Sequence, residues 1–290
     1  TFWKDAIGRL MKNKVAVVCF FIIVLLILSC IIVPFFSPFE SREQHLGEVN
    51  KGFMTVCTDP RYEGQHHVHY FGTDNLGRDL FLRAFEGGRV SLMIAFAAVF
   101  VNLIVGLIYG GISGYIGGAV DTIMMRIVEI VNGIPYLIVV ILLMMVLPKG
   151  IFTMVVAYGI TGWTGMARLV RGQVLQLKSQ EYIVAAEAMG AKSSRIIAKH
   201  LIPNALSVII INVTLAIPSA IFTEAFLSYI GLGVPVPQPS WGVLAKGGQD
   251  VFMTYPYQLV VPAVAISLTM LSFNLLGDGL RDAFDPRLRR

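Results

Sequence analysis

The sequence has 290 residues, of which 56% are hydrophobic and only 14% are charged. Soluble domains carry about 25% charged residues, so this composition excludes an ordinary soluble fold. The net charge of +5 does not come from a basic face with interleaved aromatic residues, which excludes nucleic-acid binding as the main function. We therefore expect a polytopic, all-α protein of the lipid bilayer.

The N-terminal segment 1–14 carries Lys4, Arg9, Lys12 and Lys14 and precedes an apolar run. A secretory signal has a shorter apolar region of about 7 to 15 residues and ends in a small-residue cleavage site. The run here is longer and lacks such a site. We predict an uncleaved first span over 15–36, with residues 1–14 as a cytoplasmic arm.

Six apolar runs are long enough to be transmembrane helices. They are Val15–Phe36, Ser91–Tyr115, Thr122–Val146, Phe152–Leu169, Ala205–Phe226 and Gln258–Gly277. The fourth run is the weakest, because Gly159, Gly162 and Gly165 interrupt it.

Positive residues gather in the N-terminal arm, in the loop 171–203 and in the tail 278–290. The positive-inside rule predicts that these three segments, and both termini, are cytoplasmic. Segments 37–90 and 229–257 are then extracytoplasmic, and residues 91–277 contain the remaining spans together with the loops between them.

The outer segment 37–90 contains two patterns that need interpretation. Residues Gly72 to Asp79 have the glycine spacing of a phosphate-binding loop, but Arg78 and Asp79 stand where Lys and Ser or Thr must contact phosphate and Mg²⁺. We therefore reject a nucleotide site there. Apolar residues at helical spacing over Leu76–Phe85 predict an interfacial helix before the second span.

The same segment contains His66, His67 and His69, and a histidine-rich tract can bind a transition metal. No Cys or carboxylate at a fixed spacing completes such a site, so we favour a solvated loop and assign no metal. The cysteines form no disulfide framework, and Cys57 stands alone in the loop, where we interpret it as a tolerated small residue.

The second span carries glycines at a spacing of four, which leave one stripe of the helix without side chains. They are Gly106, Gly110, Gly114 and Gly118. The stripe predicts close packing within the chain, against a partner subunit, or along a pathway. Pro135, Pro218 and Pro262 lie within spans and are candidate kinks.

Few ionisable residues lie within the spans, where charge is costly and marks functional sites. Arg126 and Glu129 are three residues apart on a helix, so they form a pair or part of a relay. Glu224 has no local partner and is our candidate for lining a pathway or gate.

No carboxylate or histidine lies near the middle of a span, which weakens the hypothesis of a proton-driven secondary transporter. No nucleophile elbow, HExxH motif or placed catalytic pair occurs, so a membrane enzyme is a distant alternative and we assign no catalytic residue. Energy for moving a solute must then come from another chain.

The cytoplasmic loop predicts a helix from Ser179 that Gly190 ends, and a second helix from Ser193 or Ser194 to Pro203. Small residues give the first helix a low profile with charges at its rim, which favours docking in the groove of an energy-supplying partner. The candidate docking residues are Glu181, Tyr182, Ala185, Ala186, Glu187, Gly190 and Pro203.

This loop resembles the cytoplasmic motif of permease subunits of ABC importers, Glu-Ala-Ala, three residues, Gly, and later Ile-x-Leu-Pro. Ala185, Ala186, Gly190 and Pro203 match, whereas Val184, His200 and Ile202 replace Glu, Ile and Leu. Further segments resemble the C-type permeases of oligopeptide and dipeptide systems. They are His69–Asp74, Gly77–Asp79, Gly87–Leu92, Gly114–Gly118, Ala167–Arg171, Leu227–Gly233, Ser240–Gly242, Phe273–Ala283 and Asp285–Pro286.

The resemblance implies the six-helix type I importer permease fold in the bacterial plasma membrane. It also implies a heterodimer with a paralogous permease, two cytoplasmic ATPase subunits that hold ATP and Mg²⁺, and an extracytoplasmic peptide-binding protein. The chain itself is then expected to hold no cofactor. Nickel and other small-solute importers use similar permeases, so they remain alternatives for the cargo.

Overall fold

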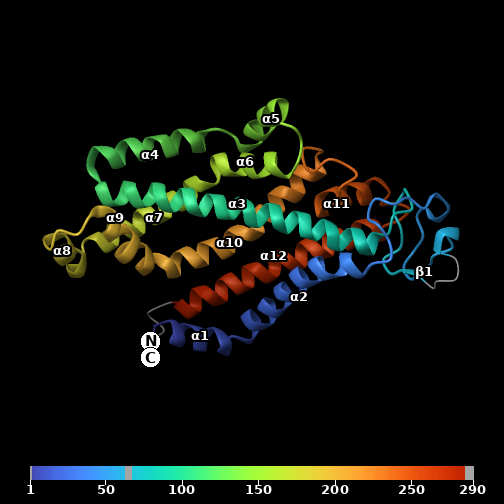
Figure 1. Cartoon of the computed structure of the whole chain (residues 1–290), viewed down its shortest axis with the longest axis horizontal. Coiled ribbons are helices and arrows are strands. Elements are labelled where there is room, and N and C mark those ends of the chain that lie inside the picture. Colours follow the sequence, from blue (N-terminus) through green and yellow to red (C-terminus); the bar gives the residue numbers. More distant parts are fainter. Residues whose placement is uncertain (1, 63–66, 285–290) are drawn as a thin grey trace.

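The computed structural model describes residues 2–62 and 67–284, which form a helical bundle with a small loop domain (residues 37–79) at one end (Figure 1). The first helices are α1 (Phe2–Lys12), α2 (Lys14–Phe36), α3 (Leu80–Ile116), α4 (Gly118–Gly133), α5 (Tyr136–Val146), α6 (Ile151–Thr161) and α7 (Trp163–Lys178). They are followed by α8 (Glu181–Ala188), α9 (Ser193–Ile196), the π-helix η3 (Ile197–Leu201), α10 (Ile202–Tyr229), α11 (Trp241–Asp250) and α12 (Tyr257–Phe284).

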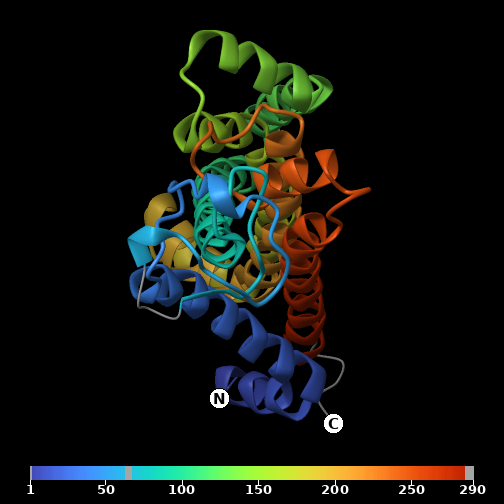
Figure 2. The same ribbon diagram turned by 90° about the vertical axis from the view of Figure 1, so that its right-hand side faces the viewer.

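Helix α3 is the centre of the bundle. It packs against α7, α10 and α2, and α12 packs against α2 and α10. Figure 2 shows α4 to α6 on one side of α3 and the N-terminal helices on the other. Ala95 of α3, Ile221 of α10 and Phe273 of α12 meet in the largest buried apolar cluster. The core is therefore built from helices that are far apart in the sequence.

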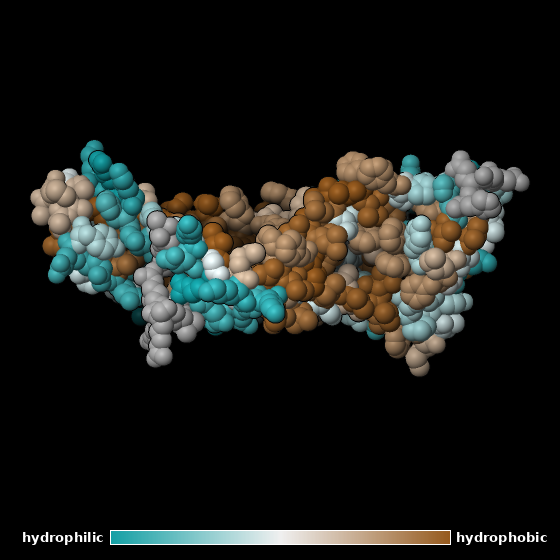
Figure 3. Space-filling model, turned by 90° about the horizontal axis from the view of Figure 1, so that it is seen from below, coloured by the Kyte–Doolittle hydropathy of each residue, from teal (hydrophilic) through white to brown (hydrophobic). Residues whose placement is uncertain are grey.

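The surface carries an apolar belt between two hydrophilic ends (Figure 3). Large apolar side chains of the helices, such as Phe100, Leu142 and Val264, are exposed. Water would make such a surface unfavourable, whereas lipid or another membrane subunit covers it without cost. The surface therefore confirms the prediction of a polytopic membrane protein.

Four helices of the described residues are long and apolar enough to cross a membrane, or five when α4 and α5 are counted as one broken span. The two halves of that span are bent by 79°. Ile134 is extended and Pro135, which lacks an N–H, is the N-cap residue of α5, so the break follows from the proline. Pro218 and Pro262 instead lie inside continuous helices.

The expected span Phe152–Leu169 differs from the structure. Gly162 separates α6 from α7, and each of these helices is too short to span by itself. A glycine in a helix carries the largest backbone entropy cost, and three of them over this run favour such an interruption. The predicted six continuous spans are therefore not found in the part of the chain that the structure describes.

The predicted interfacial helix over Leu76–Phe85 is wrong, because Leu80 already begins the 37-residue helix α3. An amphipathic surface helix occurs instead at α1, in the segment expected to be a charged arm. Trp3, Ile7 and Met11 are exposed along one side of α1, while Ala6 is buried. The spacing of four between these three apolar residues was the signal for an amphipathic helix.

The loop domain consists of the 3₁₀-helices η1 (Leu46–Glu48) and η2 (Pro60–Tyr62) and the antiparallel strands β1 (Thr55–Val56) and β2 (Val68–His69). It is tied to the bundle by side chains of α3 and α12. Arg83 Nη1 donates to the carbonyl of Ser41 at 2.7 Å, and Tyr257 Oη donates to the carbonyl of Lys51 at 2.8 Å. The domain is thus anchored at the starts of two long helices.

The segment 229–257 contains helix α11, which Ser240 caps by accepting a hydrogen bond from Val243 N. Trp241 is buried, and its Nε1 donates to the carbonyl of Ala84 at 2.9 Å. A Cβ on Gly88 would lie 2.7 Å from the indole, so glycine is required at this approach. Helix α11 therefore packs onto α3 beside the loop domain.

Candidate coupling site

Helix α8 lies at the end of the molecule opposite the loop domain (Figure 1). Backbone N–H groups of Ile183 and Val184 donate to the carbonyl of Gln180 at its start. At its end Gly190 has φ +77°, and Ala191 N donates to the carbonyl of Ala186 at 3.1 Å. Only glycine adopts this conformation without strain, so Gly190 stops the helix as the sequence predicts.

Helix α8 has an inner and an outer face. Ile183 is fully buried against Val170, Val174 and Ile196. Ala186 is only 6% exposed, so it belongs to this inner face and not to the docking surface that the sequence predicts. The inner face fixes α8 on α7 and on the segment that leads to α10.

The outer face of α8 is apolar and exposed. Tyr182 and Val184 of this helix are exposed to 42% and 55%, and Met189, which directly follows it and extends this face, is exposed to 82%. Glu181 and Ala185 are also exposed, whereas the side chain of Glu187 lies outside the described residues. Exposed apolar side chains thus gather at an end of the molecule that is otherwise hydrophilic (Figure 3).

The second predicted helix does not end at Pro203. Helix α9 continues through the π-helix η3 into α10, and Pro203 lies in the first turn of α10. Ile202 N donates to the carbonyl of Ile197, five residues back. The π-turn shifts the hydrogen-bond register just before a residue that has no N–H, so the helix continues through the proline.

Helix α7 supports α8, and the glycine stripe of α3 packs against α7. A Cβ would lie 2.6 Å from Met166 at Gly106, 2.3 Å from the Ala167 carbonyl at Gly110, and 2.9 Å from the Arg171 carbonyl at Gly114. The stripe therefore serves packing within the chain.

Gly118 does not belong to this stripe. Helix α3 ends at Ile116, and the positive φ angles of Gly117 and Gly118 form the turn into α4. No atom outside the neighbouring residues lies within 4 Å of a Cβ placed at Gly118. Gly118 keeps the spacing of four in the sequence, but it lies beyond the end of α3 and so cannot extend the stripe.

Two polar contacts tie α7 to its neighbours, and neither was predicted from the sequence. Arg171 Nε and Nη2 donate to Asp121 Oδ1 and Oδ2, both at 2.5 Å, which joins α7 to α4. Lys178 Nζ donates to the carbonyl of Tyr115 at 2.6 Å and lies over its ring, which joins α7 to the end of α3. Both contacts link residues at least 50 positions apart.

The other ionisable residues predicted in the spans lie in different places. Arg126 Nη1 and Glu129 Oε2 form an ion pair at 2.6 Å on the exposed face of α4, so the two are paired as one of the alternatives predicts. Glu224 is 2% exposed and accepts a hydrogen bond from Ser228 at 2.7 Å. This carboxylate is therefore enclosed by its own chain in this structure.

Residues Gly72 to Asp79 form a turn that organises the loop domain. Gly72 and Gly77 have positive φ and closely approach the backbone of Lys51 and His45. Asp79 caps α3 by accepting a hydrogen bond from Leu82 N at 2.7 Å. The motif therefore shapes the backbone of the loop domain and caps α3.

His69 of the histidine tract does not lie in a solvated loop. His69 is fully buried, and its Nδ1 and Nε2 lie 2.8 Å from Asp79 Oδ1 and 3.0 Å from Glu48 Oε2. His67 is partly buried and its ring contacts Phe39, whereas His66 lies outside the described residues. The interpretation of these histidines as solvent-exposed is therefore wrong for His69.

Burial and hydrogen bonding shift the pKa values of this network. Burial favours the neutral imidazole of His69, but hydrogen bonds with Asp79 and Glu48 outweigh it and raise the pKa. Burial likewise opposes ionisation of Glu48, but hydrogen bonds from Thr58, His69 and Cys57 lower its pKa overall. Burial also raises the pKa of the Cys57 thiol to about 11.

Comparison with known proteins places this architecture in a family. Residues 102–290 match the family described as binding-protein-dependent transport system inner membrane component, and residues 1–52 match the N-terminal TM domain of oligopeptide transport permease C. The chain is 50% identical over its whole length to the oligopeptide transport system permease protein OppC of Bacillus subtilis strain 168, covering 91% of that protein.

Two further relatives are similar along the whole chain. The dipeptide transport system permease protein DppC of Bacillus subtilis strain 168 is 48% identical, with 87% of it covered. The oligopeptide transport system permease protein OppC of Escherichia coli K12 is 44% identical, with 92% of it covered.

Two solved structures share the fold. The inward-facing MetNI methionine ABC transporter superposes with a TM-score of 0.55 at 22% identity, covering 70% of this chain and 97% of that one. An amino acid ABC transporter solved with histidines gives a TM-score of 0.51 at 17% identity, covering 68% and 91%. The chain thus belongs to the inner-membrane permease components of binding-protein-dependent transport systems, in the branch that contains the oligopeptide and dipeptide permeases.

Proposed function

We propose that this chain forms one half of the translocation pathway of an ATP-driven importer of peptides. A paralogous permease supplies the other half, and a binding protein outside the membrane delivers the peptide. The identity of 50% to an oligopeptide permease favours oligopeptides as the cargo. Dipeptides are the second candidate, because a dipeptide permease is 48% identical over the same length.

The α8 end of the molecule is cytoplasmic in this proposal, and the loop domain and α11 lie outside. The support is the distribution of Lys and Arg, which are concentrated in residues 1–14, 171–203 and 278–290. Both termini are then cytoplasmic in the bacterial inner membrane. The loop domain and α11 together offer a surface to the binding protein.

The observation that carries the proposal is the exposed apolar face of α8 on a buried support. Tyr182, Val184 and Met189 fit the groove of an ATPase subunit, as amphipathic helices do in helix-in-groove recognition. In this proposal the ATPase subunits hold ATP and Mg²⁺, while Gly72–Asp79 of this chain serves as a turn that caps α3.

Movement of α8 reaches the spans through α7. Ile183 fixes α8 to α7, the stripe Gly106–Gly114 fixes α7 to α3, and Arg171 fixes α7 to α4 through Asp121. Close backbone packing and a bidentate ion pair leave little freedom between these helices. When the ATPases close on ATP, α3 and α4 then move with α8, which changes the side of the membrane to which the pathway opens.

The test is assembly of the complete importer with Met189→Glu, which places a charge on the outer face of α8. We expect at least tenfold weaker association of the ATPase subunits, since burial of an unpaired charge costs more than about 1.4 kcal/mol. Met253→Glu is the matched control, because Met253 is 96% exposed near α11 at the opposite end. Equal ATPase association in the two variants would refute docking at α8.

The cargo is tested by competition for uptake into proteoliposomes that contain the complete importer and its binding protein. We expect unlabelled oligopeptides to compete for uptake of a labelled oligopeptide. Dipeptides that compete equally well would place the chain with the dipeptide systems. Competition by Ni²⁺ alone would contradict a peptide cargo.

A further inference from the structure

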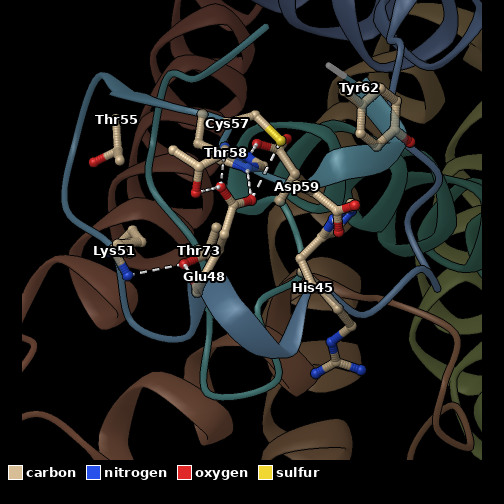
Figure 4. Close-up of polar contacts among 12 residues, drawn as sticks. His45, Glu48, Lys51, Thr55, Cys57, Thr58, Asp59, Tyr62 and Thr73 are labelled. Carbon is tan, nitrogen blue, oxygen red and sulfur yellow. Dashed lines mark hydrogen bonds and ion pairs between the residues drawn. The ribbon is translucent and has the colours of Figure 1, made fainter.

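The loop domain contains a buried cluster of metal-ligating side chains that the transport proposal does not use. One potential ligand atom from each of His45, Glu48 and Cys57 lies within 4.8 Å of the other two (Figure 4). His45 and Glu48 are each 2% exposed and Cys57 is 8% exposed. His45 precedes η1, Glu48 lies within η1 and Cys57 follows β1. The three residues therefore do not form a recognisable sequence motif.

Neighbouring groups hold the Glu48 carboxylate in place. Its Oε1 accepts hydrogen bonds from the backbone N–H and, at 3.0 Å, the hydroxyl of Thr58. Its Oε2 lies 3.3 Å from Cys57 Sγ and 3.0 Å from His69 Nε2. One carboxylate oxygen is thus fixed by the backbone, while the other faces a thiol and an imidazole.

Carboxylates orient both histidine rings. His45 Nδ1 lies 2.8 Å from Asp59 Oδ2 and 3.1 Å from Arg61 Nη2, and His69 Nδ1 lies 2.8 Å from Asp79 Oδ1. In metal sites an outer carboxylate of this kind fixes the tautomer of a ligating histidine and raises its basicity. His45 Nε2 is buried and has no hydrogen-bond partner among the described residues, although Glu43 Oε2 lies 3.7 Å away.

The backbone around the cluster is equally constrained. A Cβ on Gly77 would overlap the carbonyl of His45, so the turn Gly72–Asp79 is in close backbone contact with His45. Thr73 Oγ1 donates to the carbonyl of Glu48, and Lys51 N donates to Thr73 Oγ1 at 2.8 Å. The ligand positions are therefore largely set before any ion arrives, which lowers the ordering cost of binding.

The chemistry of these groups selects the metal. A thiolate, an imidazole nitrogen and a carboxylate oxygen together are typical ligands of Zn²⁺, whereas Mg²⁺ and Ca²⁺ require oxygen ligands. We propose that His45, Glu48 and Cys57 bind one Zn²⁺ ion in the loop domain, with His69 as a positioning residue that holds Glu48. On binding, Cys57 loses its Sγ proton to solvent and the thiolate coordinates the ion.

The test uses the complete importer, stripped of metal by chelator and then dialysed against Zn²⁺. We expect the wild type to retain one more Zn²⁺ per complex than the Cys57→Ser variant, measured by mass spectrometry. Serine keeps the hydrogen bond to Glu48, so this variant preserves the fold. Cys19→Ser is the matched control, because it removes a buried thiol of α2 and leaves the metal content unchanged.

Two further measurements distinguish coordination from a structural effect. Asp59→Asn keeps all three ligands and is expected to weaken Zn²⁺ binding by about 10- to 100-fold, as loss of an outer-shell partner does. Co²⁺ in place of Zn²⁺ is expected to give a thiolate charge-transfer absorption that Cys57→Ser abolishes. Equal metal content in wild type and Cys57→Ser, or no thiolate absorption with Co²⁺, would show a metal-free hydrogen-bond network. Because neither readout is transport, failure here leaves the proposed function untouched.

Discussion

At the scale of single residues, Gly110 shows how closely α3 and α7 approach. A Cβ there would lie 2.3 Å from the carbonyl of Ala167, a backbone atom that cannot move aside alone. We predict that Gly110→Ala destabilises the protein by about 1–3 kcal/mol, the usual cost of overpacking. Thermal unfolding of the purified complex measures it.

Gly165→Ala is the control for this prediction. Gly165 lies in α7, and no atom outside its immediate neighbours is within 4 Å of a Cβ placed there. Alanine is favoured over glycine in a helix by up to about 1 kcal/mol, so this variant should be equally stable or slightly more stable. If the two substitutions lowered the unfolding temperature equally, the prediction that α7 approaches α3 too closely for a side chain at Gly110 would be wrong.

His69 gives the loop domain a pH-dependent stability. Its pKa is raised because hydrogen bonds with Asp79 and Glu48 outweigh burial, so the folded state favours the protonated ring. That stabilisation is complete below the ordinary pKa of about 6.5 and is lost as the pH rises through the raised value.

We predict that the unfolding temperature of the metal-free importer, kept in chelator, falls as the pH rises above about 6.5, and that His69→Gln flattens this dependence. Glu48 acts in the opposite direction. Because its pKa is lowered, its contribution is present above about pH 4.3 and is lost as the pH falls through the lowered value. An identical pH dependence in wild type and His69→Gln would contradict the assignment.

At the scale of elements, the ion pair between Arg171 and Asp121 joins α7 to α4. We predict that Asp121→Asn costs about 1–3 kcal/mol, because the guanidinium loses a charged partner. ATP-driven uptake should fall several-fold, while association of the ATPases remains unchanged, since the outer face of α8 is not altered.

The double variant Asp121→Arg with Arg171→Asp tests the pairing directly. It restores opposite charges at the same two positions, so it should recover part of the uptake that each single change removes. Uptake and ATPase association are measured on the same proteoliposomes. Weaker ATPase association in Asp121→Asn would show that α4 contributes to docking and would contradict this division of roles.

The sequence predicted those elements whose signals are local. Gly190 ends α8 as expected, because a left-handed turn after a helix requires a residue type that is visible in the sequence. Apolar runs likewise predicted α2, α10 and α12, since length and hydropathy alone decide a span. The glycine spacing predicted close packing, although it could not say which helix approaches.

Features that depend on distant partners were not predicted. The pairing of Arg171 was not predicted, because nothing in the sequence connects this residue to Asp121, 50 positions away. Glu48 was not singled out, since its contacts with Cys57 and His69 exist only after the loop domain has folded. The amphipathic spacing in α1 was present but was outweighed by its positive charges.

At the scale of the whole molecule, the two hydrophilic ends must lie on opposite sides of the membrane. Met189 beside α8 and Met253 beside α11 are the most exposed apolar positions at these ends, at 82% and 96%. The three native cysteines are all buried, so an introduced cysteine is labelled with little background. The orientation can therefore be measured without further changes to the chain.

We predict that a membrane-impermeant maleimide labels the Met253→Cys protein in cells with an intact inner membrane, and labels the Met189→Cys protein only after that membrane is permeabilised. The cells should produce both permeases without the ATPases, so that α8 stays uncovered. Adding purified ATPases to permeabilised cells should then protect Met189→Cys and leave Met253→Cys labelled, because only the α8 end docks them. Labelling of Met189→Cys in intact cells would reverse the topology, and the surfaces assigned to the ATPases and to the binding protein would have to be exchanged.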